Sequence, residues 1–171
     1  MEEQWFAFCP YCGAKYKKVR TNPHLCPGCN REYYINPHPC NAVILENSKK
    51  EILLVIRGIA PHKGKFDLPG GFINLGENAE DSVRREVREE LGIRITDFSY
   101  FGSYVDRYPY KGITYYTLCF FYTARIPNRQ PMKPADDVSS FIFVPKSRIP
   151  YGSLAFEGIK KALKKFSGVT R

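Results

Sequence analysis

The sequence predicts an α+β protein in which a small metal-binding segment precedes one larger domain. Three observations support this: two close pairs of cysteines near the start, a series of strand-like apolar runs, and a highly charged stretch with helical spacing between them. With 171 residues and 43% hydrophobic content, the chain can build one core of ordinary size and carry a small appendage.

The composition is basic, with a formal net charge of +9. Such an excess of positive charge attracts phosphorylated substrates and can hold RNA, but net charge alone selects neither partner. The segment Met1 to Gln4 is acidic, no apolar signal region follows it, and no apolar run reaches membrane-spanning length. We therefore expect a cytoplasmic protein that does not enter a membrane.

Four of the six cysteines form two CxxC pairs, Cys9 with Cys12 and Cys26 with Cys29, separated by 13 residues. This spacing is typical of four thiolates around one tetrahedral Zn²⁺ ion, and four protein ligands leave no open position for chemistry. We therefore predict a structural zinc site. Two disulfides or redox dithiols are the alternative, which the lack of an export signal disfavours.

A domain boundary is predicted at the sequence Asn-Pro-His-Pro of residues 36–39, because two prolines suit a short stiff connection. The zinc ribbon would occupy residues 1–36 and the larger domain residues 37–171. Cys40 and Cys119 lie in apolar, strand-like runs, where a buried free cysteine is the ordinary explanation.

The larger domain should contain several strands and a final helix. Strands are predicted at 40–46, 51–57, 98–108, 113–126 and 141–144, with a turn at 109–112 and a helix at 153–166. The tyrosines of the two long strands, including Tyr104 and Tyr108, could stack on a base, although half-buried strands also favour aromatic residues for packing.

The stretch from Gly71 to Ile93 predicts a loop that leads into a helix. Asn78 is a suitable N-cap and Gly92 a suitable C-terminal stop. Between them an apolar stripe recurs every four residues, at Ala79, Val83, Val87 and Leu91. At 3.6 residues per turn, this stripe contains Glu90 and is bordered by Glu86.

Glu86 and Glu90 are therefore acids at the buried edge of a helix, at a like-charge spacing that costs stability unless a cation intervenes. Hard divalent ions accept several carboxylate oxygens, so we interpret the cluster as a Mg²⁺ or Mn²⁺ site. A solvated helix carrying salt bridges such as Arg85 with Glu89 is the alternative.

The same stretch resembles the Nudix box at all nine specified positions over 23 residues, and the preceding Leu-Pro-Gly-Gly also resembles the entry to that box. The matching residues are Gly71, Glu77, Arg85, Glu86, Val87, Glu89, Glu90, Gly92 and Ile93. The whole chain resembles Nudix hydrolases that carry an N-terminal zinc ribbon. The resemblance implies an α/β/α sandwich with a mixed sheet, and divalent-metal-dependent pyrophosphohydrolase activity toward a nucleoside diphosphate joined to another group.

The resemblance also implies roles for particular residues. Glu86 and Glu90 would be the principal metal ligands, Glu89 a third ligand or the general base, and Gly71 a backbone contact to the metal. Arg85 would orient the acids together with Glu77.

Other candidate residues lie outside the box. Asp136 and Asp137 occupy a late loop where the family sometimes places a further acid. The basic loop after Arg57, with His62, Lys63 and Lys65, is where a polyphosphate could be met, although a solvated loop explains it equally well.

Substrate choice depends on the stretch from Ser103 to Pro109. Ribbon-bearing NADH pyrophosphatases are similar in ribbon and box but carry Ser-Gln-Pro-Trp-Pro-Phe-Pro, whereas this chain reads Ser-Tyr-Val-Asp-Arg-Tyr-Pro. Pro109 lies where ADP-ribose pyrophosphatases tend to have proline. We therefore expect ADP-ribose or FAD as the substrate, giving AMP and a second phosphorylated product.

Two alternatives stay open. One is NADH, NAD-cap or RNA 5′-end processing, with RNA a less favoured partner. The other is a zinc-ribbon regulator that only binds nucleic acid or a nucleotide, which the complete set of catalytic acids disfavours. A homodimer is suggested by analogy with relatives.

Overall fold

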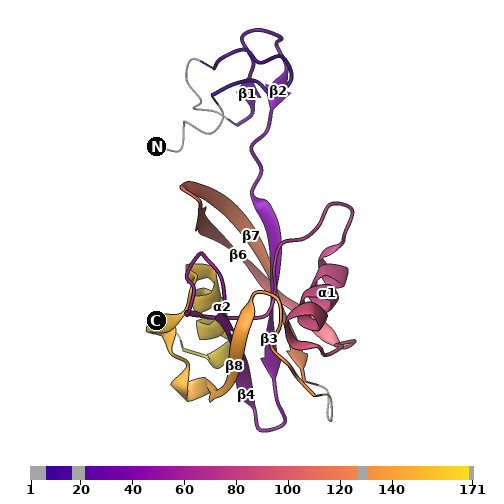
Figure 1. Ribbon diagram of the computed structural model, residues 1–171, viewed down its shortest axis with the longest axis vertical. Helices are drawn as coiled ribbons and strands as arrows, with labels where there is room; N and C mark the ends of the chain where they lie inside the picture. The colour runs from indigo at the N-terminus through magenta and orange to yellow at the C-terminus, as the bar shows by residue number, and fades with distance from the viewer. Residues whose placement is uncertain (1–6, 17–21, 127–130, 170–171) are drawn as a thin grey trace.

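The computed structural model describes residues 7–16, 22–126 and 131–169 (Figure 1). In the ribbon, β1 (His24–Leu25) pairs antiparallel with β2 (Glu32–Tyr33). The larger domain contains β3 (His38–Glu46), β4 (Glu51–Arg57), β5 (Phe66–Asp67), α1 (Ala79–Leu91), β6 (Phe98–Tyr110), β7 (Ile113–Arg125), β8 (Val138–Pro145) and α2 (Glu157–Ser167). Two 3₁₀ turns, η2 (Lys146–Arg148) and η3 (Tyr151–Ser153), connect β8 to α2. Neither α-helix combines the length and the apolar character that a membrane-crossing helix needs.

The larger domain is built on one mixed sheet of six strands. The order is β5-β4-β3-β7-β6, and β8 pairs with β4. Strands β3 and β7 are parallel, whereas the other pairs are antiparallel. Helices α1 and α2 cover opposite faces of the sheet (Figure 1), so the α+β sandwich with a mixed sheet is confirmed.

The two cores follow from alternation along the buried strands. Val43 and Leu45 of β3 point toward α1, while Ala42 and Ile44 point toward α2. Because successive strand residues face opposite sides of a sheet, an almost continuous apolar run supplies both cores. The stripe of α1 completes the first core, and Ile159, Ala162 and Leu163 of α2 complete the second.

Helix α1 begins and ends where the sequence indicates. The side-chain oxygen of Asn78 accepts a hydrogen bond from the Asp81 N–H at 2.8 Å. Gly92 has a φ of 72° and donates its N–H to the Arg88 carbonyl at 3.0 Å. This cap and this stop fix the two ends of the helix. The apolar stripe of α1 packs into the core, and this packing turns Glu86 and Glu90 inward.

A glycine-containing loop, residues 69–73, follows β5 in the sequence and leads toward α1. In space it lies beside β3, while β5 pairs with β4, so that the segment is inserted between these two strands at one end of the sheet. Two backbone hydrogen bonds hold it to β3. The Val43 N–H donates to the Pro69 carbonyl at 2.9 Å, and the Asn41 N–H donates to the Gly71 carbonyl at 2.9 Å. Gly70 has a φ of 147°, and a Cβ there would lie 2.2 Å from the Asn41 carbonyl oxygen. Only glycine can follow this path, which opens the sheet beside α1.

Several expected boundaries are wrong, including the starts of β3 and β8, which lie at His38 and Val138 rather than at residues 40 and 141. Pro109 lies inside β6, and the turn consists of Lys111 and Gly112 with φ values of 48° and 78°. Because β6 is an edge strand, it tolerates proline. Helix α2 begins at Glu157 rather than at residue 153, since the N–H of Ala155 is bonded to the Phe66 carbonyl at 2.8 Å, outside any helix.

We predict that Gly70→Ala destabilises the fold far more than Gly76→Ala. At Gly70 the added methyl group meets backbone at 2.2 Å, so a loss of about 3 kcal/mol or more is expected. At Gly76, with a φ of 81° and open space around it, left-handed backbone alone should cost about 1–2 kcal/mol. Urea unfolding measures both, and equal losses would contradict the close packing of the loop against β3.

Candidate functional site

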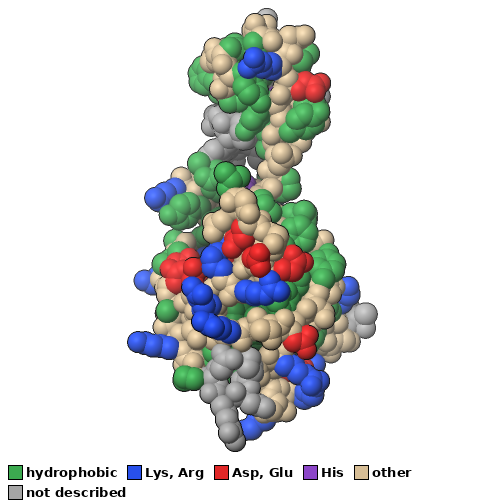
Figure 2. Space-filling view, turned by 90° about the vertical axis from the view of Figure 1, so that its right-hand side faces the viewer, with side chains coloured by type: hydrophobic (Ala, Val, Ile, Leu, Met, Phe, Trp, Pro, Cys, Tyr) green, Lys and Arg blue, Asp and Glu red, His purple; other side chains and the backbone are tan. Residues whose placement is uncertain are grey.

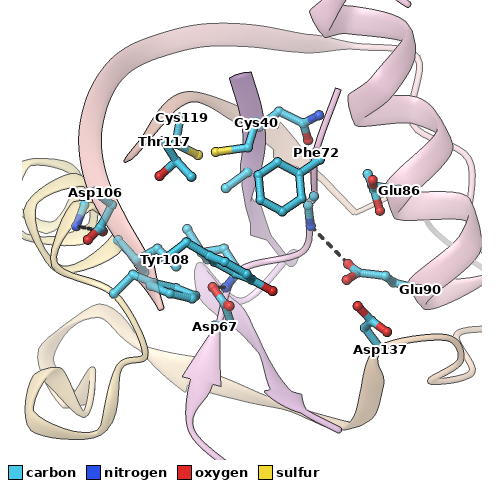
Figure 3. A pocket seen from close by; sticks show the side chains of 18 of the residues that line it. Cys40, Asp67, Phe72, Glu86, Glu90, Asp106, Tyr108, Thr117, Cys119 and Asp137 are labelled. Atoms are coloured by element: carbon cyan, nitrogen blue, oxygen red, sulfur yellow. Dashed lines mark hydrogen bonds between the residues drawn. The ribbon is translucent and has the colours of Figure 1, made fainter. Parts of the chain in front are cut away.

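A cavity of about 310 Å³ opens between α1, the loop of residues 69–73 and the start of α2 (Figure 3). Its walls carry two guanidinium groups, from Arg57 and Arg85. They also carry seven carboxylates, from Asp67, Glu86, Glu89, Glu90, Asp106, Asp136 and Asp137. Such an excess of acid repels a phosphate group unless cations are also present. The cavity therefore suits metal ions first and phosphates only in their company.

Glu90 and Glu86 are the most buried acids of α1, with 5% and 8% of each residue exposed. Glu90 accepts a hydrogen bond from the Gly70 N–H at 3.0 Å. Burial raises the pKa of both carboxyl groups, and neighbouring acids raise it further: Glu86 beside Glu90, and Glu89 beside Glu86. A cation between them would reverse this unfavourable charge.

The surroundings of Glu86 fit a metal ion. A Cβ on Gly71 would lie 2.4 Å from a Glu86 carboxylate oxygen, so glycine leaves the carboxylate its space. Asn41, which also lines the cavity, donates its side-chain N–H to Ser82 Oγ at 2.6 Å. Its buried Oδ1 atom has no hydrogen-bond partner among the described residues. Buried carboxylates and an amide oxygen are the hard oxygen donors that Mg²⁺ and Mn²⁺ prefer.

The predicted backbone contact from Gly71 depends on its carbonyl oxygen. That oxygen accepts the Asn41 N–H at 2.9 Å, and a carbonyl retains a second lone pair. Gly71 therefore still has an acceptor to offer, and its role toward a metal stays a prediction.

Arg85 organises the other acids of the box. It forms two parallel bonds to Glu77, from Nε at 2.8 Å and from Nη2 at 2.9 Å. Its Nη1 atom donates to Glu86 at 2.8 Å and to Glu89 at 3.0 Å. The Arg85 guanidinium lowers the pKa of Glu77 to about 2. Glu77 does not line the cavity, so its structural effect is to hold Arg85 in place.

Charges on the outer side of α1 are also paired. Arg84 contacts Asp81 at 2.7 Å, and its guanidinium carbon lies 4.8 Å from the centre of the Phe98 ring. Figure 2 shows acidic and basic side chains intermixed on this side of the molecule. The buried Glu90 is different, because no basic side chain among the described residues forms an ion pair with it.

Asp136 and Asp137 reach the cavity from the loop before β8. The N–H of Ala135 donates to the Glu90 carbonyl at 3.0 Å, which anchors this loop to the end of α1. The Asp137 carbonyl accepts the Gly58 N–H at 2.7 Å. Burial, and then the charge of Asp136, raises the pKa of the Asp137 carboxyl group. Figure 3 shows this side chain beside Glu90.

Arg57 lies on the opposite wall. Its Nη1 atom donates to Asp67 at 2.8 Å and its Nε atom to the Pro61 carbonyl at 2.7 Å. The guanidinium carbon lies 5.2 Å from the centre of the Phe156 ring. Burial raises the pKa of Asp67 to about 6 even though Arg57 opposes the shift. Arg57 is therefore a fixed cation that faces the cavity from β4.

Of the residues proposed for substrate contact, Arg57 and Tyr108 line the cavity. The Tyr108 ring stacks on Phe156 at 5.7 Å and meets Phe72 edge-on at 5.4 Å. Tyr104 instead packs against Phe121 in the core beneath α2, because its place on β6 is deeper along the strand.

Four further candidates are also absent from the cavity wall. Pro109 is exposed on β6, and Lys63 and Lys65 are exposed on the loop before β5. His62 lies outside the cavity lining, and its ring meets Phe156 edge-on at 5.1 Å. The loop curls back through the Lys65 N–H to the His62 carbonyl, which keeps the two lysines away from the cavity.

Sequence reasoning missed several cavity residues, chiefly Asp67, Phe72, Asp106 and Phe156. Phe72 lies inside the box at an unspecified position. Asp106 lies in the stretch where the chain departs from the NADH pyrophosphatase pattern, which is a signal that could have identified it. Asp67 and Phe156 carry no local signal, since only the tertiary fold brings them to the cavity.

The ribbon cysteines come together as predicted. The sulfur atoms of Cys9, Cys12, Cys26 and Cys29 all lie within 4.8 Å of one another. Cys9 and Cys29 are separated by 3.8 Å, and Cys12 and Cys26 by 3.6 Å. A tetrahedron with Zn–S bonds of about 2.3 Å requires roughly 3.8 Å between sulfurs. The cluster therefore fits a structural Zn²⁺ site.

Backbone geometry supports this assignment. The N–H of Tyr11 donates to the Cys9 sulfur at 3.4 Å, and the N–H of Gly28 donates to the Cys26 sulfur at 3.3 Å. Gly13 and Asn30 follow the two pairs with positive φ values of 73° and 54°. Both pairs thus form the same tight turn, with amides directed at sulfur.

A family model described as NUDIX domain matches residues 36–165. Among curated proteins, the NAD-capped RNA hydrolase NudC of Vibrio vulnificus is 33% identical over 101 residues, which cover 58% of this chain and 38% of that protein. The protein of the same name from Salmonella heidelberg is 33% identical over 94 residues, covering 54% and 36%. The matched part of the chain thus spans well under half the length of these relatives.

Solved structures show the same fold. A NUDIX hydrolase from Nitrosomonas europaea superposes with a TM-score of 0.64 and 26% identity, covering 94% of this chain and 90% of the other. The NUDIX domain of Shewanella oneidensis NrtR, solved with ADP ribose, has a TM-score of 0.65 and 20% identity, covering 80% and 91%. At that identity the second likeness concerns the fold alone.

We predict one tightly held zinc per chain in protein purified without chelators. Cys26→Ser should lose it, because three thiolates and a hydroxyl hold zinc poorly, whereas Cys40→Ser should retain it. Metal analysis by mass spectrometry measures both. Wild-type protein without zinc would contradict the structural site.

We also predict that Glu77→Gln lowers the thermal unfolding midpoint, on the order of 5 °C, by removing a charge-assisted pair with Arg85. The folded pKa of Glu77 is about 2, below its ordinary value of 4.5. Its stabilisation is therefore complete above pH 4.5 and is lost as the pH falls toward 2. The gap between variant and wild type should narrow below pH 4.5, and a constant gap between pH 7 and 3 would refute the ion pair as its cause.

Proposed function

The chain belongs to the NUDIX family, and on that premise we propose that it hydrolyses the diphosphate bond of a nucleoside diphosphate joined to a second group. The products would be AMP and a second phosphorylated compound. One observation carries the proposal: Glu86 and Glu90 are buried together in a cavity whose excess of acid requires cations before a phosphate can enter. The names of the matched relatives, which are hydrolases, support the same activity.

We propose Mg²⁺ or Mn²⁺ as the catalytic ion and Zn²⁺ as the structural ion. Glu86 and Glu90 would hold the catalytic ion, with the Gly71 carbonyl as a further ligand and Glu89 as either a third ligand or the general base. When bound, the divalent ion would neutralise diphosphate oxygens and polarise the attacking water. The zinc site would keep the ribbon folded and would take no part in the reaction.

The chain's own residues would then position the reactants. Arg85 holds Glu86 and Glu89 in fixed orientations, so the acids need no reorganisation when the substrate binds. Arg57 faces the cavity as a fixed cation and would contact a phosphate oxygen. The bound diphosphate would therefore lie between α1 and Arg57.

In the chemical step, water attacks one phosphorus atom and the bond from that phosphorus to the bridging oxygen breaks. A carboxylate must accept the proton of the water. We propose Glu89, which lines the cavity and whose side chain is 42% exposed, so it can meet a water at the cavity mouth. Asp136 and Asp137 are the second candidates, because they face the same space from the other side of Glu90.

Among substrates, the curated relatives favour NADH or NAD-capped RNA over ADP-ribose and FAD. Their names state action on NAD-capped RNA, and we propose an NAD-type dinucleotide as the first candidate. ADP-ribose or FAD is the second candidate, supported by the absence of the Gln-Pro-Trp sequence from the stretch after Ser103. All four substrates share an adenosine diphosphate half, so the proposed bond cleavage is the same.

We predict that wild-type protein releases AMP from NADH, or processes NAD-capped RNA, faster than it hydrolyses ADP-ribose, FAD or diadenosine polyphosphates. Each substrate would be supplied with Mg²⁺ and with Mn²⁺ in turn, and products would be separated by chromatography. If only ADP-ribose or FAD were hydrolysed, the second candidate would be selected. No hydrolysis of any substrate would contradict the proposed activity, and RNA binding without turnover would favour a regulator.

We further predict that Glu90→Gln reduces metal-dependent turnover roughly 100-fold or more, since it removes a ligand charge from the buried cluster. Asp97→Asn is the matched control, because it removes an exposed acid outside the cavity lining. Circular dichroism should show both variants folded. A Glu90→Gln variant with wild-type turnover would rule out the metal assignment.

A further inference from the structure

The cavity continues past the loop of residues 69–73 into a recess floored by β3, β7 and β6. Strand register places Cys40 directly beside Cys119, and Thr117 directly beside Asp106. These four residues define the recess, and Figure 3 shows them on the side of the cavity away from Glu86 and Glu90. The recess is therefore a second compartment, distinct from the metal end of the same cavity.

Asp106 is held in this recess by backbone groups on two sides. One carboxylate oxygen accepts its neighbour's N–H, from Arg107, at 2.9 Å. The other accepts the N–H of Gly158 at 2.6 Å, in the first turn of α2. Each oxygen retains a further lone pair. Among the described residues, no basic side chain forms an ion pair with Asp106.

The charge of Asp106 determines which part of a substrate can lie in the recess. Asp106 would repel a diphosphate from the recess, which agrees with the place proposed for the diphosphate between α1 and Arg57. The rings of Phe72 and Tyr108 line the same cavity and meet edge-on at 5.4 Å, which gives it an aromatic surface against which a planar heterocycle can pack. The residual acceptors of Asp106 suit a hydrogen-bond donor, and the donor that a planar base presents at its edge is an NH₂ group.

Residue 106 is also one of the positions at which the chain departs from the NADH pyrophosphatase pattern. That pattern has tryptophan at the position where this chain has aspartate. A tryptophan offers a stacking surface and a single donor, whereas Asp106 offers a fixed negative charge that only accepts. A site with this charge selects ligands by their donors and rejects ligands that carry a negative charge of their own.

We propose that Asp106 is a specificity-determining residue that accepts a hydrogen bond from the NH₂ group of a base in this recess. The inference rests on the proposed function. The shared chemistry is a planar base with an exocyclic amine or amide, and the substrate offers two such groups: the 6-amino group of adenine and the carboxamide of nicotinamide. Asp106 would reject a base with an oxygen or a carboxylate at that position.

The test compares kcat/KM for NAD⁺ with two analogues, in Mn²⁺. The nicotinic acid analogue replaces the carboxamide by a carboxylate, and the hypoxanthine analogue replaces the adenine amine by a carbonyl. If the wild type hydrolyses ADP-ribose instead, inosine diphosphate ribose serves for the adenine arm. The wild type should disfavour one analogue by roughly 10-fold or more, and the arm affected identifies the base.

In the Asp106→Asn variant, kcat/KM for the disfavoured analogue should lie within about 3-fold of kcat/KM for NAD⁺, because the amide removes the charge. Its side-chain oxygen can still accept the Gly158 N–H, so the bond to the first turn of α2 is kept. Asp106→Ser, also neutral, provides a second variant, and thermal unfolding verifies the fold of both. Asp97→Asn, the control used above, should leave the wild-type ratio unchanged.

Two results would overturn the inference. One is a wild type whose kcat/KM for both analogues equals that for NAD⁺. The other is a pair of folded Asp106 variants whose ratio of kcat/KM between NAD⁺ and each analogue stays within about 2-fold of the wild-type ratio. Failure of the proposed function is separate, because wild-type protein would then hydrolyse no substrate before any variant is measured.

Discussion

The structure depends on an imbalance of charge beside α1. Arg85 bonds to Glu77, Glu86 and Glu89, so the acids on that side have a cation at contact distance. Within the part of the chain that the structure describes, the Glu90 carboxylate accepts one hydrogen bond, from the Gly70 N–H, and the residue is almost fully buried. An isolated carboxylate in such a place costs several kcal/mol unless it is protonated or meets a positive ion. The fold thus maintains a site that is unfavourable until a cation occupies it.

Backbone geometry makes this imbalance possible. The loop of residues 69–73 lies between β3 and β4, where Gly70 passes against Asn41 and Gly71 against Glu86 at distances that exclude a side chain. The same loop supplies the N–H that contacts Glu90 and the Phe72 ring that flanks the recess. The cluster of acids beside α1 and the recess beside Asp106 are therefore connected by one short segment.

Sequence alone was informative where chemistry depends on local spacing. The apolar stripe of α1 fixes which face of the helix is buried, so Glu86 and Glu90 could be assigned to its buried edge. Two CxxC pairs likewise suffice to place four thiolates together. Residues brought in by strand register could not be located, because Asp106 faces Thr117 only through the long β6–β7 hairpin. Closeness in sequence was also a poor guide to the cavity lining. Tyr104 and Pro109 are close neighbours of Tyr108 on β6, yet they lie outside the cavity.

The most direct test of this account is the thermal unfolding midpoint of wild type and Glu90→Gln, with and without Mn²⁺. Without added divalent ion, the variant should be the more stable, because it carries no uncompensated buried charge. Saturating Mn²⁺ should raise the wild-type midpoint and leave the variant nearly unchanged. Equal responses to Mn²⁺, or a variant less stable than wild type in its absence, would contradict a metal site built on Glu90.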